Sequence, residues 1–551
     1  MRRARSRSSA RFFRATLACV LLAGVARVSL GQAPGHDGHS LGVVDFPVSC
    51  SAGVRPAFDR AVALLHHMTY PEARKAFELV AATDPTCAMA QWGIAMTLFQ
   101  PLWPTRPGPD ALRRGWNAVE KADAIGVPTE RERLFVAAAE AFFLEPASTD
   151  YWLRIRRWAH SSEQLYSAFP NDDDAASFYA LALLATAPAD TASRVNADSA
   201  AAILLRVYAR NPRHPGAIHY FIHADDVPGR ERESLAIVRS YDAIAPRNPH
   251  ALHMPTHIYT RLGDWDAVVR GNLEAANAAL EYRAGDSGQF VWDEFPHAIE
   301  YLVYAYLQQG RDEAAADQIR RLRATPRLEP TFKTAFHLSS TQARYALERR
   351  DWNHAAAIVP RQPSTISWDR FAWPEAISWF ARGLGAAHLG RIDEARQSAD
   401  RLDVLDSASG KAGETLFARN VRVLRLELRA WIAHVAGQCD SSAQLMNEAV
   451  VLEAATPKAA VTPAPTLPAQ ELLGDMLVEQ GRSSEALAAY RRALELYPNR
   501  FNSLLGAARA ARAAGDTAQA RTLYGQLLTV AKGGTRRPAL REAQRFGDQR
   551  R

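Results

Sequence analysis

A period of about 34 residues recurs in this chain of 551 residues and limits what it can fold into. Near the C-terminus, Gly481 recurs as Gly515 and Ala486 as Ala520. Apolar residues return every three or four positions in blocks separated by Gly, Pro or Asp-Pro, which is typical of amphipathic helices. No stretch has the alternation of a strand. The pattern predicts an all-helical chain of stacked hairpins, because one hairpin cannot bury its apolar face alone.

The C-terminal period resembles the tetratricopeptide repeat family, in which small residues let the two helices of a hairpin approach and a proline ends the second helix. The positions in 467–500 that carry this resemblance are Gly474, Gly481, Ala486, Tyr490, Ala493 and Pro498. The resemblance implies an all-α, right-handed superhelical solenoid of about nine to eleven helical hairpins.

Three further segments resemble the recurrent blocks of a narrower family. They read CAMAQWGIAMTLFQPLW, HPGAIHYFIHA and PHALHMPTHIYTRLGDW. Similar blocks occur in an uncharacterised family of exported bacterial tetratricopeptide repeat proteins. That resemblance covers most of 53–350 and implies export, but it implies no activity.

Composition shifts along the chain predict six segments. A basic N-terminus, an apolar run and small residues are typical of a secretory signal peptide, so we expect an exported protein, periplasmic or extracellular, with no stable membrane span after cleavage. The expected segments are a signal peptide at 1–33, an arm at 34–52, a degenerate repeat solenoid at 53–455, a Pro/Ala linker at 456–466, a C-terminal repeat pair at 467–532 and a basic disordered tail at 533–551.

The positive charge of the chain belongs to its two ends. Of the net charge of +7, residues 1–33 hold seven arginines and no acid, and 532–551 hold a surplus of five positive charges, which leaves −5 for the body. A body without a basic surplus gives no electrostatic footprint for nucleic acid. We therefore expect no nucleic-acid partner.

Cysteine usage leaves two alternatives open. After removal of 1–33, Cys50, Cys87 and Cys439 remain, and no CxxC pair suggests a thiolate metal site. In an exported protein Cys50 and Cys87 could form a disulfide that ties the arm to an early helix. The alternative is three free thiols.

Histidines concentrate between His214 and Asp264, where six of the sixteen in the chain lie. His219 and His223 are four positions apart, and both recur one period later, as His253 and His257. In the family that the chain resembles, the first helix of each hairpin lines a concave groove that binds peptides. The turns at Gly229, Gly263 and Gly310 place these candidate groove residues: His219, His223, His250, His253, His257, His297, Glu300 and Tyr304.

The same register suggests a metal site as an alternative. Residues four apart share a helix face, and packed helices lie about 8–10 Å apart. Imidazoles from two adjacent helices could therefore converge with a carboxylate on zinc or another divalent transition metal. The candidate ligands are His219, His223, His253, His257 and Glu300. The competing interpretation is that these histidines are satisfied side chains that line the groove wall.

The leading hypothesis is a binding scaffold outside the cytoplasm, with a protein or peptide partner in the concave groove. A metal-binding protein or metal-dependent enzyme is the alternative. No GxSxG, P-loop, GxGxxG or HExxH motif occurs, so the sequence favours a protein that is not an enzyme and offers no catalytic residue.

Overall fold

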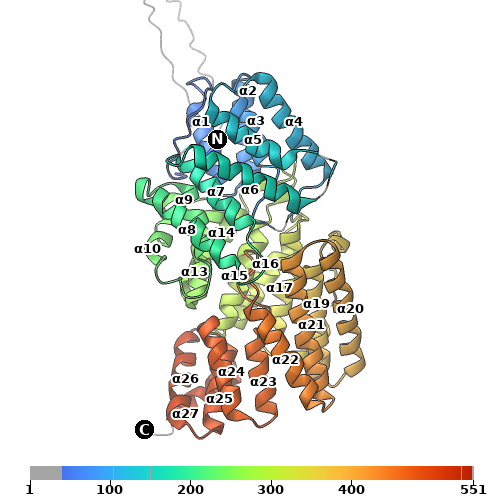
Figure 1. Cartoon of the computed structure of the whole chain (residues 1–551). Helices are drawn as coiled ribbons and strands as arrows, with labels where there is room; N and C mark the ends of the chain where they lie inside the picture. The colour runs from blue at the N-terminus through green and yellow to red at the C-terminus, as the bar shows by residue number, and fades with distance from the viewer. Residues whose placement is uncertain (1–39, 104, 146, 149, 535, 549–551) are drawn as a thin grey trace, which may run out of the picture. The chain divides into compact units, whose positions relative to one another are not determined.

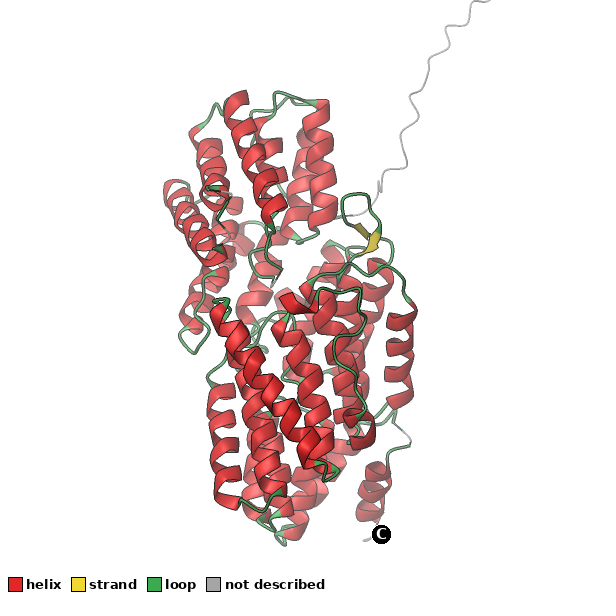
Figure 2. Cartoon of the chain, turned by 90° about the vertical axis from the view of Figure 1, so that its right-hand side faces the viewer, coloured by secondary structure: helices red, strands yellow, loops and turns green. Residues whose placement is uncertain are grey.

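The computed structural model describes residues 40–103, 105–145, 147–148, 150–534 and 536–548, which form helices joined by short loops (Figures 1 and 2). The first nine helices are α1 Arg55–His66, α2 Tyr70–Thr83, α3 Ala88–Met96, α4 Pro109–Ile125, α5 Glu130–Phe143, α6 Tyr151–Ala168, α7 Asp173–Ala185, α8 Ser193–Arg210 and α9 Pro215–Asp225. The middle elements are α10 Leu235–Val238, α11 Tyr241–Ile244, α12 Pro249–His253, α13 Pro255–Leu262, α14 Trp265–Ala279, β1 Arg283–Ala284, β2 Phe290–Val291, α15 Glu294–Gln308, α16 Asp312–Ala324, α17 Phe332–Leu347 and α18 Trp352–Ala356. The last are η1 Trp368–Arg370, α19 Ala372–His388, α20 Ile392–Lys411, α21 Thr415–Val435, α22 Cys439–Ala454, α23 Ala469–Glu479, α24 Ser483–Leu496, α25 Phe501–Ala513, α26 Thr517–Val530 and α27 Pro538–Asp548.

The helices stack as a repeat array. Most pack against the next along the chain, and α15, α17, α19, α21, α23 and α25 also pack against one another in series. This is the arrangement of stacked hairpins, in which first helices form one layer and second helices the other. The predicted all-α solenoid is confirmed. The two short strands form a small antiparallel pair between α14 and α15.

The small residues of the C-terminal period do the packing expected of them. A Cβ atom at Gly474 would lie 2.7 Å from the ring of Tyr490, and one at Gly506 would lie closer still. Gly481 and Gly515 follow α23 and α25 with φ of +74° and +85°, the left-handed conformation that glycine adopts after a helix. Close approach of the Tyr490 ring therefore requires glycine at 474 and 506, and the left-handed backbone favours it at 481 and 515.

The stretch 226–262 departs from the regular hairpin. The repeat register predicts a full second helix between Gly229 and Pro246, but only the four-residue helices α10 and α11 form there. The next first helix is divided into α12 and α13 at Met254, because Pro255 has no N–H to donate to the helical ladder. This irregular stretch carries three of the clustered histidines.

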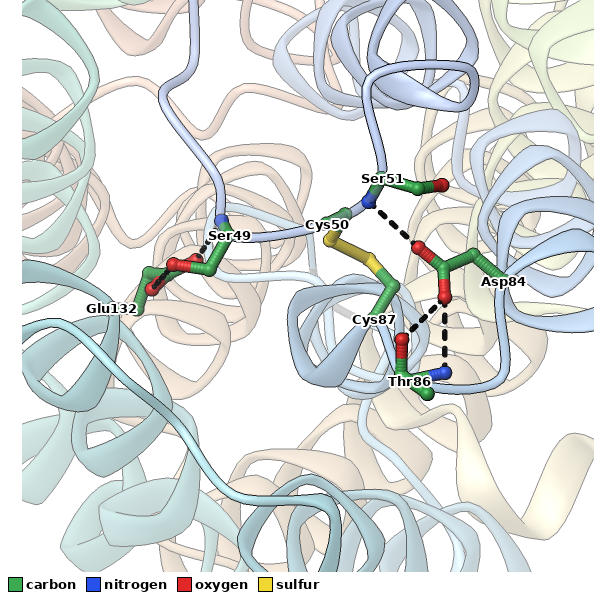
Figure 3. The surroundings of a disulfide bond; sticks show 7 residues. All are labelled: Ser49, Cys50, Ser51, Asp84, Thr86, Cys87 and Glu132. Carbon is green, nitrogen blue, oxygen red and sulfur yellow. Dashed lines mark hydrogen bonds between the residues drawn. A yellow bond between two sulfur atoms is a disulfide. The ribbon is translucent and has the colours of Figure 1, made fainter.

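The N-terminal arm is fixed to the first hairpins (Figure 3). Cys50 and Cys87 form a disulfide, so the paired alternative is the one found, and Cys439 is free and exposed. The backbone N–H and the hydroxyl of Ser49 donate to the carboxylate of Glu132 over 2.6 and 2.7 Å. The described part of the arm is therefore packed structure.

Residues 456–468 are packed into the array. Val461, Ala464 and Leu467 are buried. The guanidinium of Arg344 on α17 donates to the carbonyl of Ala464 over 2.5 Å and to that of Pro465 over 2.8 Å. The prediction of a linker at 456–466 is wrong. These residues are packed into the array, and their carbonyls are the hydrogen-bond partners that the buried cation of Arg344 needs. We call 456–468 the covering segment.

The C-terminal helices contact the middle of the chain. Buried Arg500 donates to the Tyr304 hydroxyl over 2.9 Å and pairs with Glu348 and Glu471. Within the predicted disordered tail, Pro538–Asp548 form α27, which buries Leu540 and Ala543. Residues 549–551 lie outside the described part.

The predicted signal peptide, residues 1–33, also lies outside the described residues. Within the residues that the structure describes, every helix is too short or too polar to cross a bilayer.

Candidate metal centre

Six histidines from four helices meet in one buried region. Helix α9 carries His219 and His223, α12 carries His250 and His253, α13 carries His257, and α15 carries His297. Helices α9, α12 and α13 each begin with a proline in the first turn, which suits helix initiation, and the break at Pro255 separates His253 from His257. The 34-residue recurrence thus places equivalent histidines side by side on adjacent hairpins.

The four histidines predicted to converge do not share one point. They divide into two groups, and each group gains a third histidine. His219 and His223 join His250, and we call this the first triad. His253 and His257 join His297, which we call the second triad, and within each triad the nitrogen atoms that could bind a metal lie within 4.8 Å of one another. The sequence predicts His250 and His297 as groove residues only.

In the first triad, two ring nitrogens face each other. His219 donates its Nδ1–H to the carbonyl of His66 over 2.6 Å, and His250 donates its Nδ1–H to Glu294 over 2.9 Å. A neutral imidazole has one N–H and one lone pair, so both Nε2 atoms carry lone pairs. These two Nε2 atoms are 3.0 Å apart. The Nε2 of His223 is buried and has no hydrogen-bond partner.

The second triad repeats this pattern. His253 donates its Nδ1–H to Asn272 Oδ1 over 2.7 Å, and His257 donates its own to Asp226 over 2.8 Å. Asn272 is oriented because its amide N–H donates to the carbonyl of Val268. The Nε2 atoms of His253 and His257 are again 3.0 Å apart. The Nε2 of His297 is buried without a partner, as in the first triad.

A chain of hydrogen bonds fixes the third ring of the second triad. His337 on α17 donates its Nδ1–H to Glu300 over 2.5 Å, and its Nε2 lies 3.0 Å from Nδ1 of His297. His297 therefore donates from Nδ1 and keeps its lone pair on Nε2. Glu300 is predicted as a ligand, but His337, Ser340 and Arg344 occupy its carboxylate, so it supports the site indirectly.

Sequence reasoning misses His337. The separation between His297 and His337 differs from the repeat period, so the 34-residue spacing does not reveal it. The signal that could have found it is its offset from the following turn, because His337 lies 13 residues before Arg350 as His297 lies 13 before Gly310.

The predicted groove residues are buried rather than exposed. Every one of them is buried except His223, which is partly exposed but whose Nε2 atom is buried. The covering segment lies over the second triad. Its Lys458 pairs with Asp226 over 2.6 Å. The Tyr301 hydroxyl of α15 lies 3.4 Å from the carbonyl of Thr462 in this segment and 3.4 Å from the ring nitrogens of His257. Tyr304 meets Arg500 instead of solvent. The structure does not place these residues in an open peptide groove.

Trp103 covers the histidine region from another side. Its ring makes edge contacts with His250 and with His297, at centroid distances of 5.3 and 5.8 Å, so it touches one ring of each triad. The ammonium of Lys333 lies 4.0 Å from the centre of the Trp103 ring and pairs with Glu294. Trp103 thus packs against both triads.

Burial keeps four of these rings neutral. Desolvation disfavours an imidazolium and lowers the pKa of His257 to about 4. It also lowers the pKa of His219, His253 and His297 well below the ordinary value. At neutral pH each of these rings therefore offers one lone pair.

A third cluster contains His66, Asp174 and His214, and it has the opposite proton arrangement. His214 accepts from the backbone N–H of Ala217 at Nδ1, so its Nε2–H donates to Asp174. His66 donates its Nε2–H to the same carboxylate oxygen over 2.9 Å, and its Nδ1 faces the Tyr220 hydroxyl. Every ring nitrogen has a partner. Although the three residues have the spacing of a metal site, their lone pairs are already used.

Comparisons with known proteins agree with the fold. Residues 477–537 match the model of the tetratricopeptide repeat. The C-terminal part of the chain therefore carries tetratricopeptide repeats. No curated protein matches this chain.

Solved structures similar to this chain include a human IFIT1 dimer with m7Gppp-AAAA, at 11% identity and a TM-score of 0.35. Another is a monomeric mutant of IFIT1 with Gppp-AAAA, at 12% identity and a TM-score of 0.33. In both cases the match covers 88% of this chain and 96% of the other.

The prediction that excludes a nucleic-acid partner is wrong. The similar solved structures are complexes with capped RNA. The resemblance to exported bacterial proteins stays a prediction.

Proposed function

We propose that this protein binds two transition-metal ions, one in each triad. The observation that supports it is the pair of Nε2 atoms, 3.0 Å apart in each triad, whose protons are fixed on the opposite side of each ring. Two lone pairs at that distance repel each other unless a cation lies between them. A proton there would create a buried imidazolium, which is costly. A metal ion satisfies both lone pairs and the unpartnered third nitrogen together.

The surroundings are those of metal ligands. Histidines that bind metals donate the second ring nitrogen to a carboxylate, a backbone carbonyl or another fixed acceptor, which orients the ring and raises its basicity. Five of the six rings do this, through His66 O, Glu294, Asn272, Asp226 and His337. Three nitrogens per ion leave an open coordination position, as in catalytic rather than closed structural sites.

Metal analysis of protein purified without a histidine tag tests the proposal. We expect two ions per chain, and a stabilisation of about 2.7 kcal/mol for each site filled at 100 times its dissociation constant. His223→Ala removes a ligand whose Nε2 makes no hydrogen bond, so it should lose one ion and leave the metal-free fold intact. His214→Asn is the matched control and should keep both ions. Protein that stays metal-free and does not shift its melting temperature with zinc, copper or iron would sink the proposal.

We also propose that the protein works outside the cytoplasm, in the periplasm or extracellular space. The disulfide between Cys50 and Cys87 supports this, since such bonds persist in oxidising compartments. The basic and apolar N-terminal segment agrees with it. Cell fractionation and the N-terminal sequence of the mature chain are the test, and a cytoplasmic protein that keeps 1–33 intact would contradict it.

A protein or peptide partner is the second candidate function. An open pocket of about 720 Å³ favours it, located away from the triads beside α16, α17, α25 and α27. Its arginines are Arg311, Arg349, Arg350, Arg509, Arg536 and Arg537. Arg311→Glu should weaken the binding of an acidic peptide, measured by fluorescence polarisation, and an unchanged affinity would exclude this pocket.

A further inference from the structure

The donor atoms of the two triads limit which metal fits. All six are imidazole nitrogens, and the nearby carboxylates of Asp226, Glu294 and Glu300 are occupied by N–H groups and cations. Hard ions such as magnesium, calcium and manganese prefer oxygen ligands, and non-haem iron sites typically include a carboxylate. Three imidazoles suit zinc and copper, and copper binds more tightly in the general order of divalent affinities.

The charge around the triads is balanced before any metal enters. Four acids contact four bases in three groups: Asp226 with Arg261 and Lys458, Asp293 and Glu294 with Lys333, and Glu300 with Arg344. Two divalent ions without an anionic ligand would bring four positive charges into a buried site. Burying uncompensated charge is expensive, so the site favours monovalent ions or a pair of ions that share an anion.

The two triads are close enough to share a ligand. The rings of His223 and His257 have centroids 5.8 Å apart, and those of His250 and His253 are 6.0 Å apart, so each triad packs directly on the other. Trp103 bridges His250 and His297 across the same boundary. The open pocket lies elsewhere, and Trp103 and Lys458 of the covering segment contact the triads. Because the facing ring nitrogens are buried, a shared ligand has to be small.

We propose that the two triads hold a pair of copper ions that binds dioxygen between them. This inference rests on the proposed metal binding and names the metal and its ligand. Each Cu(I) gives one electron to dioxygen, which becomes a two-electron-reduced, dianionic O₂ unit bridging two Cu(II) ions. No proton or further reductant is needed. The total charge stays at +2 through the step, which suits a buried site whose own charges cancel.

Oxygen uptake by copper-loaded protein tests the inference. Metal-free protein is loaded anaerobically with Cu(I) and then exposed to dioxygen. We expect one dioxygen per two copper ions, a new absorption band that disappears on removal of oxygen, and no copper signal in electron paramagnetic resonance, because the two Cu(II) spins couple through the shared ligand. Two tightly bound ions with no oxygen uptake would overturn the copper–dioxygen inference while metal binding survives. Failure to bind any metal would remove both.

Single-ligand variants separate a coupled pair from two isolated ions. His223→Ala and His297→Ala each leave one complete triad, so each should bind one copper, take up no dioxygen and, after chemical oxidation, show the resonance of an isolated Cu(II). Circular dichroism checks that both fold, and His214→Asn should behave as wild type. A full isolated Cu(II) signal from the oxygenated wild type would overturn the coupled pair.

Discussion

Two kinds of histidine cluster lie close together in this fold, and they differ in where their protons are. In the cluster of His66, Asp174 and His214, both Nε2–H groups donate to one carboxylate. In the two triads the protons lie on Nδ1, and the Nε2 atoms face one another as lone pairs. Both arrangements have ligand-like spacing. Distance alone therefore does not distinguish a metal site from a buried hydrogen-bonded network.

The tautomer of each ring distinguishes the two kinds of cluster, and groups outside the cluster fix that tautomer. The backbone N–H of Ala217 fixes His214 with its proton on Nε2, while the carbonyl of His66 fixes His219 with its proton on Nδ1. One neighbouring donor or acceptor thus turns the same side chain into a structural donor or a free ligand. The comparison can be tested by removing these partners one at a time.

Replacing Asp174 by Asn should have the largest effect on stability and none on metal content. Asparagine keeps one acceptor oxygen but removes the negative charge that both imidazole N–H groups face, and the loss of these charge-assisted hydrogen bonds costs about 3 kcal/mol. Urea unfolding measures the loss, and metal analysis should still find two ions. A variant that loses metal but not stability would reverse the roles assigned to the two kinds of cluster.

The pH dependence of the same variant gives a second readout. Burial acts to raise the pKa of Asp174, but hydrogen bonds from His214 and His66 outweigh it and hold the pKa below its usual range. A lowered folded-state pKa contributes stability above the unfolded value of about 3.9, and this stability is lost as the pH falls through the folded value. The difference between wild type and Asp174→Asn should therefore be constant above about pH 4 and shrink below it.

Asn272→Leu should weaken metal binding in the second triad alone. Leucine has a similar size but cannot accept the Nδ1–H of His253, so the ring loses its fixed tautomer. Loss of such a partner typically costs about 10- to 100-fold in metal affinity. Titration of the variant should show one unchanged and one weakened site.

Asn420→Leu is the matched control for this experiment. Its amide donates to the carbonyl of Leu416 four positions earlier, as that of Asn272 does to Val268, but it contacts no histidine of the triads. Equal weakening by both variants would mean that the loss comes from helix packing and not from the orientation of His253.

The fold and part of the site were predictable because they follow from local periodicity. The 34-residue spacing places His219 and His253 on equivalent helices, and it correctly predicts that these helices are neighbours. It could not predict that Pro255 divides one of them, or that the partners of each ring come from distant segments such as α14 and α17. The covering segment was missed because its prolines and alanines suggest a linker, and only tertiary contacts with Arg344 bury it.

The smallest expected effect concerns His214, which also caps α9. Its Nδ1 accepts the backbone N–H of Ala217, a role that asparagine performs well and alanine cannot. His214→Ala should be less stable than His214→Asn by about 1 kcal/mol, measured by urea unfolding, and both should keep two metal ions. His223→Ala is the counterpart in the first triad and should show the reverse, with one ion lost and almost no loss of stability in the metal-free chain. If His214→Ala and His223→Ala behaved alike in both measurements, proton placement would not separate a structural histidine from a ligand in this fold.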